Sequence, residues 1–178
     1  MAEILQEKWM KGVAVTTTCL AVMTAIAASR GTACVSKTQL LTAIESSKWA
    51  YYQAKSIKQN LAETQKNSFE VEVLGAANAG QKALYEEKLN TAIAEISRYD
   101  NEKNQIRQEA EDTGTKNKLL GKKGNFFSAA VVFFQIAIML SSVGALLKKK
   151  YLWIIGLAFG TIAAVLLGYG LFLQPLLF

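Results

Sequence analysis

One segment of the chain comes within a single residue of a known phosphate-binding pattern. Residues 31–38 (GTACVSKT) differ from the pattern G-x-x-x-x-G-K-[ST] because Ser36 stands where the second glycine belongs. That glycine lets backbone amides curl around phosphates, and the pattern also needs a preceding β-strand. Here an apolar stretch that reads as a membrane helix comes before it. We therefore expect no nucleotide binding.

The other chemical groups are glutamates and cysteines, and the chain has no histidine. Nothing orients the glutamates, so we expect a solvated surface rather than a metal site or an acid–base pair. Cys19 and Cys34 would lie roughly 22 Å apart on a continuous helix, too far for a disulfide. We expect no catalytic residue, metal or cofactor, and no enzyme. The glutamates are Glu70, Glu72, Glu86 and Glu87.

The densest aromatic run of the polar part is residues 47–55 (SKWAYYQAK). On a helix, Trp49 and Tyr52 share one face, and Tyr51 lies on another. Packing within a helical hairpin or an oligomer is one interpretation. A docking surface for another protein is the second, because Trp and Tyr are frequent anchors in interfaces.

Three apolar stretches must position these residues: 13–29, 126–147 and 151–173. The third has no charge in 23 residues, enough for a helix to cross a hydrocarbon core of roughly 30 Å. The first also resembles a secretory signal, with Lys8 and Lys11 in front and a small-residue pattern at residues 25–27. It continues without a polar end, so we expect a retained helix. The fold class predicted is an all-α integral membrane protein with three transmembrane helices.

Small and polar residues are the candidates for packing inside the membrane. Gly156 and Gly160 form a GxxxG pair, which fits either an intrachain contact or a dimerisation face. Gln135 is the only large polar residue of the second stretch and fits either an interhelical hydrogen bond or a pore lining. Small residues of the first stretch are spaced for close helix contact: Ala14, Thr18, Ala21 and Ala25.

The connections between these stretches differ in length. Residues 147–151 allow only a tight hairpin, so the second and third helices must be antiparallel neighbours. Gln174 and Pro175 should end the last helix, because proline cannot continue it. The long polar segment has no proline, and we expect domains at residues 1–30, 31–125 and 126–178.

The polar segment 31–125 predicts a helical hairpin that projects from the membrane. Either a cap at residues 36–39 starts its first helix, or the first membrane helix continues outward. Residues 69–73 alternate with period two, which fits a short strand or an irregular tip, and we favour the tip. Helical spacing in the first arm is set by Leu40, Ile44, Tyr51, Ala54, Ile57 and Leu61.

The second arm carries a heptad pattern, with spacings that alternate between four and three. Arg98 with Glu102 and Arg107 with Glu111 should pair along one side of it. Two helices enclose little core, so the hairpin is expected to need partners. The heptad positions are Tyr85, Leu89, Ala92, Ile96, Tyr99, Lys103, Ile106 and Ala110.

The chain resembles a bacterial family of membrane proteins, the domain-of-unknown-function family 4337. The likeness begins in SSKWAYYQAKSIKQNL and continues in YEEKLNTAIAEISRYDNEKNQIRQEA and FFSAAVVFFQIAIMLSSVGALLKKKYLW. The chain departs from the family in its short N-terminus. The resemblance implies a bacterial membrane protein with a helical insert. It brings no established activity, and no catalytic residues carry over.

Charge indicates how the chain is placed in the membrane. The net charge is +6, and lysines gather beside the apolar stretches, which indicates lipid headgroups rather than nucleic acid. Lys8, Lys11 and residues 148–150 favour the cytoplasmic side. We expect a multi-pass protein of the bacterial inner membrane, with the insert and the C-terminus in the periplasm.

The function expected is a non-enzymatic scaffold that self-associates, or an accessory subunit of a larger membrane complex. Its contacts would come from the aromatic run and the heptad face, so that aspartate at Leu89 and Ile96 would dissolve the assembly. The alternative is a homo-oligomeric channel or transporter subunit, which a flux assay would distinguish. That alternative is weaker because no charge inside the membrane marks an ion route.

Overall fold

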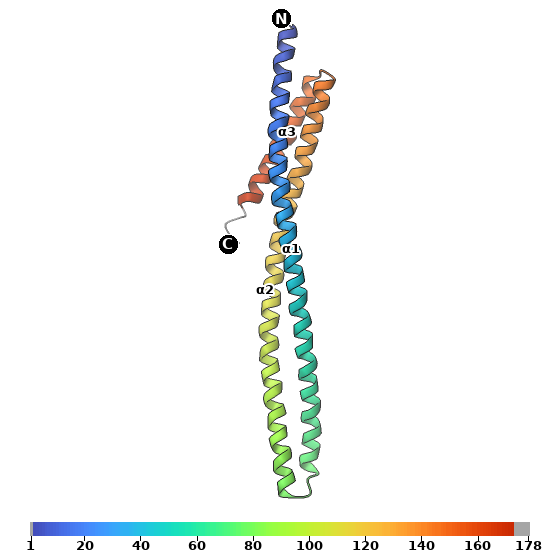
Figure 1. The fold of residues 1–178 in the computed structure, drawn as a ribbon, viewed down its shortest axis with the longest axis vertical. Coiled ribbons are helices and arrows are strands. Elements are labelled where there is room, and N and C mark those ends of the chain that lie inside the picture. The colour runs from blue at the N-terminus through green and yellow to red at the C-terminus, as the bar shows by residue number, and fades with distance from the viewer. Residues whose placement is uncertain (1, 173–178) are drawn as a thin grey trace. The chain divides into compact units, whose positions relative to one another are not determined.

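The structure, a computed structural model, describes the backbone of residues 2–172 and the side chains of residues 9–172. It contains three helices: α1 (Ala2–Leu74), α2 (Ala79–Leu146) and α3 (Lys150–Phe172) (Figure 1). The described part of the chain has no strand, which confirms the all-α prediction. Each helix contains a segment long and apolar enough to cross a membrane. The predicted helix end at Gln174 and Pro175 lies outside the described residues.

The chain divides into two compact units, and α1 and α2 contribute to both. Unit 1 comprises Met1–Gln39 and Lys118–Phe178, and unit 2 comprises Leu40–Asn117. No fresh helix starts at residues 36–39, because α1 continues through them. Of the two alternatives for this segment, the continuous helix is the one observed.

The core of unit 1 combines large aromatic rings with small residues. On α1, buried residues recur every seven positions at Val13, Leu20, Ala27 and Cys34, as expected for a helix packed along one seam. Phe127 and Phe134 of α2 are fully buried among small residues. The rings fill the space between the helices, and the small residues let the helices approach closely. The core cluster is Leu20, Ala27, Cys34, Phe127, Ala130, Phe134, Ala137, Ala163 and Leu167.

The small residues predicted to pack the first membrane helix lie on its exposed side, away from the core of unit 1. For packing inside the chain that prediction is wrong, because α1 packs instead along the seam at Val13, Leu20, Ala27 and Cys34. Leu20 reaches Gly160 of α3, where the absence of a side chain leaves space for it. The residues on the exposed side of α1 are Ala14, Thr18, Ala21 and Ala25.

The turn between α2 and α3 confirms the predicted tight hairpin. Lys148 has a φ of 53°, the left-handed conformation that ends many helices. The amide of Lys149 donates to the carbonyl of Gly144 (2.9 Å), and the amide of Lys148 donates to the carbonyl of Ala145 (3.2 Å). This is the Schellman arrangement, which satisfies carbonyls at the helix end.

Aromatic residues pack at both ends of the apolar segments. Trp9 contacts Trp153 with ring centroids 6.5 Å apart, and the indole of Trp153 donates to the hydroxyl of Thr16 (3.1 Å). At the other end, Phe126 contacts Tyr169 at 6.1 Å. Tryptophan and tyrosine gather at membrane–water interfaces, so both ends have the composition of an interface.

The tip of unit 2 is shorter than predicted. The irregular tip at residues 69–73 is wrong, because α1 continues to Leu74. Phe69 and Val73 are half-buried in the helix, and Lys66 pairs with Glu70 one turn apart (3.1 Å). The turn instead spans residues 75–78, where the side chain of Asn78 accepts from the amide of Gln81 (2.9 Å) and caps α2.

Candidate protein-contact site

The helices of unit 2 meet along a seam whose covered positions alternate spacings of three and four, the pattern of a coiled coil. Figure 1 shows the two helices of this unit side by side. On α1 the seam residues are Leu41, Glu45, Lys48, Tyr52, Lys55, Gln59, Ala62, Lys66, Phe69 and Val73. On α2 they are Tyr85, Leu89, Ala92, Ile96, Tyr99, Lys103, Ile106, Ala110, Thr113 and Asn117.

Polar contacts connect the two sides of the seam. The ammonium of Lys55 lies 2.5 Å from a carboxylate oxygen of Glu102, and Lys103 donates to the side-chain carbonyl of Gln59 (2.9 Å). Nearer the other end of the unit, Lys48 pairs with Glu109 (3.1 Å). Polar groups at a helix interface fix register more than they add stability. The seam therefore specifies how α1 and α2 pair.

The aromatic run contributes rings to the same seam. Trp49 contacts Tyr52 edge-on, with centroids 5.7 Å apart. Lys55 lies 5.3 Å from the ring of Tyr51 and 5.5 Å from that of Tyr99. Such cation–π contacts add a modest attraction. Tyr52 and Tyr99 thus serve the intrachain seam, whereas Tyr51 stays 54% exposed.

These contacts shift the ionisation of the charged groups. The hydrogen bond from Lys55 lowers the pKa of Glu102, and the same bond raises the pKa of Lys55. On the outer side of α2, a hydrogen bond to Glu111 raises the pKa of Arg107. Arg107 lies 2.9 Å from Glu111 and Arg98 lies 3.8 Å from Glu102, so both predicted pairs form.

The predicted heptad face of α2 is covered by its own chain. Its members are half-buried or buried, and two of them, Tyr99 and Lys103, contact side chains of α1. Their role in contacts with other proteins stays a prediction. The half-buried candidates are Tyr85, Leu89, Ile96, Tyr99 and Ile106.

A second stripe on α1 of unit 2 has no partner among the residues that the structure describes. We call it the outer stripe; its positions also alternate spacings of three and four, and none carries a charge. Leu40, Ile57, Leu61 and Val71 are 61%, 68%, 58% and 69% exposed. Part of the outer stripe supplied the helical spacing predicted for the first arm, and its second heptad phase is visible in the sequence. The outer stripe is Leu40, Ala43, Ser47, Ala50, Ala54, Ile57, Leu61, Thr64, Ser68 and Val71.

In unit 1, the GxxxG pair makes an intrachain contact. A Cβ added at Gly156 would lie 2.6 Å from the hydroxyl of Ser141 and 2.9 Å from the carbonyl of Ala137. The backbones of α2 and α3 therefore approach closely at this point. Gln135 lies on the exposed side of α2.

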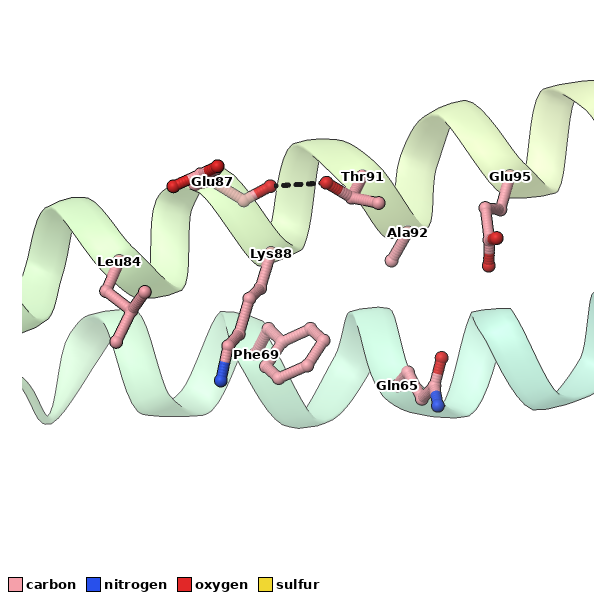
Figure 2. Close-up of a pocket in the computed structure, with 8 residues that line it drawn as sticks. All are labelled: Gln65, Phe69, Leu84, Glu87, Lys88, Thr91, Ala92 and Glu95. Carbon is pink, nitrogen blue, oxygen red and sulfur yellow. Dashed lines mark hydrogen bonds between the residues drawn. The ribbon is translucent and has the colours of Figure 1, made fainter.

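A shallow groove of about 370 Å³ opens near the tip of unit 2, at the small seam residue Ala92 (Figure 2). Lys88 and Phe69 both line this groove, and the ammonium of Lys88 lies 5.7 Å from the centre of the Phe69 ring. Thr91 turns its hydroxyl to the backbone carbonyl of Glu87 (2.9 Å). Lys88 and Thr91 therefore contact their own chain, and we assign no ligand to this groove.

The remaining chemical candidates are not assembled into a site. Glu70 and Glu86 pair with lysines one turn away. Among the described residues, no three His, Cys, Asp or Glu side chains come together as metal ligands. Residues 31–38 are helical, so their amides serve the helix and cannot curl around a phosphate.

Comparison with known proteins places the chain in a family. The model of the family described as Domain of unknown function (DUF4337) matches residues 9–173, most of the chain. No match was found among curated proteins or among solved structures. The resemblance seen in the sequence is thereby confirmed. The chain belongs to the family described as Domain of unknown function (DUF4337).

Proposed function

We propose that this protein is a membrane-anchored scaffold that self-associates through unit 2, alone or as an accessory subunit of a larger complex. The observation that carries the proposal is the outer stripe. A helix with two heptad phases has two faces for coiled-coil partners, and the seam occupies only one of them. A solvated helix gains nothing from ten successive uncharged heptad positions unless another helix covers them.

The outer stripe fits a second copy of the same stripe. Neither stripe carries charge, so two of them meet without like-charge repulsion. Alanine and serine allow close approach of the backbones, and Leu40, Ile57, Leu61 and Val71 supply apolar area. Copies inserted the same way in one membrane present their stripes in the same direction, which favours a parallel pair.

The proposal places the three apolar segments in the bilayer and the polar part, residues 31–125, outside it as a helical hairpin. Residues 8–44 and 113–178 contain no aspartate or glutamate, so their lysines and arginine suit anionic headgroups. The basic turn at residues 148–150 favours the cytoplasmic side, and the hairpin is then periplasmic in a bacterial inner membrane.

Aspartate at two positions of the outer stripe tests the proposal. In the full chain, Ile57→Asp with Leu61→Asp buries charge in the proposed contact but leaves the seam intact. Native mass spectrometry after gentle detergent extraction should give an oligomer for the original chain and a single chain for the variant.

The matched control adds the same two charges to the exposed side of α2, as Asn90→Asp with Asn101→Asp. It should keep the original mass. This pair of variants separates the outer stripe from the seam, whereas aspartate at Leu89 and Ile96 would also disrupt the intrachain contact. An unchanged mass of the Ile57/Leu61 variant would refute the proposed role of the outer stripe.

A further inference from the structure

Gln135 occupies an unusual place on the second apolar segment. It is the only large polar residue between residues 126 and 147, and it is exposed on α2. It lies eight residues after Phe127 and eleven before Leu146, or about 12 Å and 16 Å along the helix. In a hydrocarbon core of roughly 30 Å, its amide is therefore near the middle.

The residues that the structure describes provide no partner for this amide. The neighbouring residues Phe134 and Ala137 turn into the core of unit 1 and are fully buried, which leaves Gln135 on the opposite side. Within the described residues, no hydrogen bond or ion pair involves the Gln135 side chain.

The surroundings of a membrane segment cannot satisfy the amide either. Acyl chains offer neither donors nor acceptors, and a polar group at that depth is stabilised by a partner on another helix. The segment from residue 125 to residue 147 has no ionisable side chain, so the same segment of a second copy cannot form an ion pair with it. The partner must offer a neutral donor and a neutral acceptor.

We propose that Gln135 of one copy hydrogen-bonds to Gln135 of a second copy within the membrane. A primary amide carries both a donor and an acceptor, so two copies related by a two-fold axis satisfy each other. Val132 and Met139, one turn away on either side, are 53% and 66% exposed and add apolar contact. This inference rests on the proposed self-association and names a contact for it on α2.

Energy transfer between labelled copies in phosphatidylcholine vesicles tests the contact on the full chain. The label is attached at Ala77→Cys, in the turn of unit 2, with Cys19→Ser and Cys34→Ala to remove the native thiols. Gln135→Met keeps the length and shape of the side chain but removes the amide. Loss of one interhelical hydrogen-bonded contact should raise the dissociation constant in the bilayer about threefold to thirtyfold.

Two variants make the measurement specific. Gln135→Asn keeps an amide and should weaken association less than Gln135→Met does. Met139→Leu changes a neighbouring residue of the same face at nearly constant volume, and its dissociation constant should stay within about twofold of the original. Circular dichroism should report the same helix content for all three.

The possible failures are distinguishable. If the original chain associates and Gln135→Met associates equally well, the amide contact is refuted while self-association stands. If the original chain shows no energy transfer at any protein-to-lipid ratio, both the contact and the proposed function are refuted.

Discussion

Single residues of the seam decide how α1 and α2 of unit 2 pair. The ammonium of Lys55 contacts Glu102 and also lies over the rings of Tyr51 and Tyr99. Leucine in its place would pack against many partners equally well, whereas an ammonium needs its carboxylate at one position. The pair therefore selects a register at a modest gain in stability.

The lowered pKa of Glu102 makes part of this stability depend on pH. A carboxyl whose folded pKa is depressed contributes stability above its ordinary pKa of about 4.3, and the contribution disappears as pH falls through the folded pKa. Glu102→Gln should therefore melt below the original chain at pH 7. The difference should shrink as the pH falls below about 4.3 and vanish once the pH lies below the folded pKa, where both side chains are neutral.

Thermal unfolding of the full chain in a non-ionic detergent, followed by circular dichroism, measures this difference. Glu87→Gln serves as the control, because Glu87 is an exposed carboxylate of the same helix, and its replacement should leave the melting temperature unchanged across the same pH series. A difference for Glu102→Gln that stays constant as the pH is lowered into the acid range would contradict the assigned role of the pair.

At the scale of the helices, much of the fold was predictable from spacing. The heptad positions of α2, the tight turn at residues 147–151 and three apolar segments were all visible in the sequence. The α1 side of the seam was not, because it consists largely of polar residues such as Glu45, Lys48 and Gln59. The tip was misplaced because the local alternation at residues 69–73 concealed the longer helical spacing that includes Phe69 and Val73.

The candidate site was only partly predictable. Trp49, Tyr51 and Tyr52 stand out by residue type, but sequence does not tell which of the rings contacts its own chain. The outer stripe is marked by spacing and by absence of charge, and only the structure showed that the seam lies on another face of α1. Exposure of Gln135 likewise depends on which side of α2 faces the core of unit 1.

The contact between α2 and α3 predicts a graded response to added methyl groups. Gly156→Ala places a Cβ against the backbone of Ala137, so the helices must separate, at a cost of about 1–3 kcal/mol. Gly160→Ala crowds the flexible end of the Leu20 side chain, meets Ala137 only at ordinary contact distance, and should cost less. Gly168→Ala, with nothing within 4 Å, should be neutral or slightly stabilising.

Unfolding in mixed micelles, with an increasing fraction of a denaturing detergent, ranks the stabilities of the three glycine variants directly. With Trp49→Phe as background, the two remaining tryptophans, Trp9 and Trp153, both lie in unit 1, and their emission reports loss of its packing. Equal stability of the Gly156 and Gly168 variants would show that α2 and α3 do not approach closely at Gly156.

At the scale of the whole molecule, charge divides the sequence. Residues 8–44 and 113–178 carry only positive charge, and every aspartate and all but two glutamates lie between them; the two exceptions are Glu3 and Glu7. A basic apolar part and a mixed-charge helical part suit a protein that is anchored in lipid and makes contacts through helices. The proposed scaffold uses the first part for insertion and the second for recognition between copies.

The central claim is that copies meet along the outer stripe, and thiol cross-linking in vesicles tests it most directly. With Cys19→Ser and Cys34→Ala as background, Ala54→Cys lies on the outer stripe and Glu63→Cys lies on another exposed side of α1. Facing helices in contact bring equivalent stripe positions within the reach of a disulfide. Mild oxidation should yield a covalent dimer for Ala54→Cys and little for Glu63→Cys, whereas equal yields, or none for Ala54→Cys, would contradict the account.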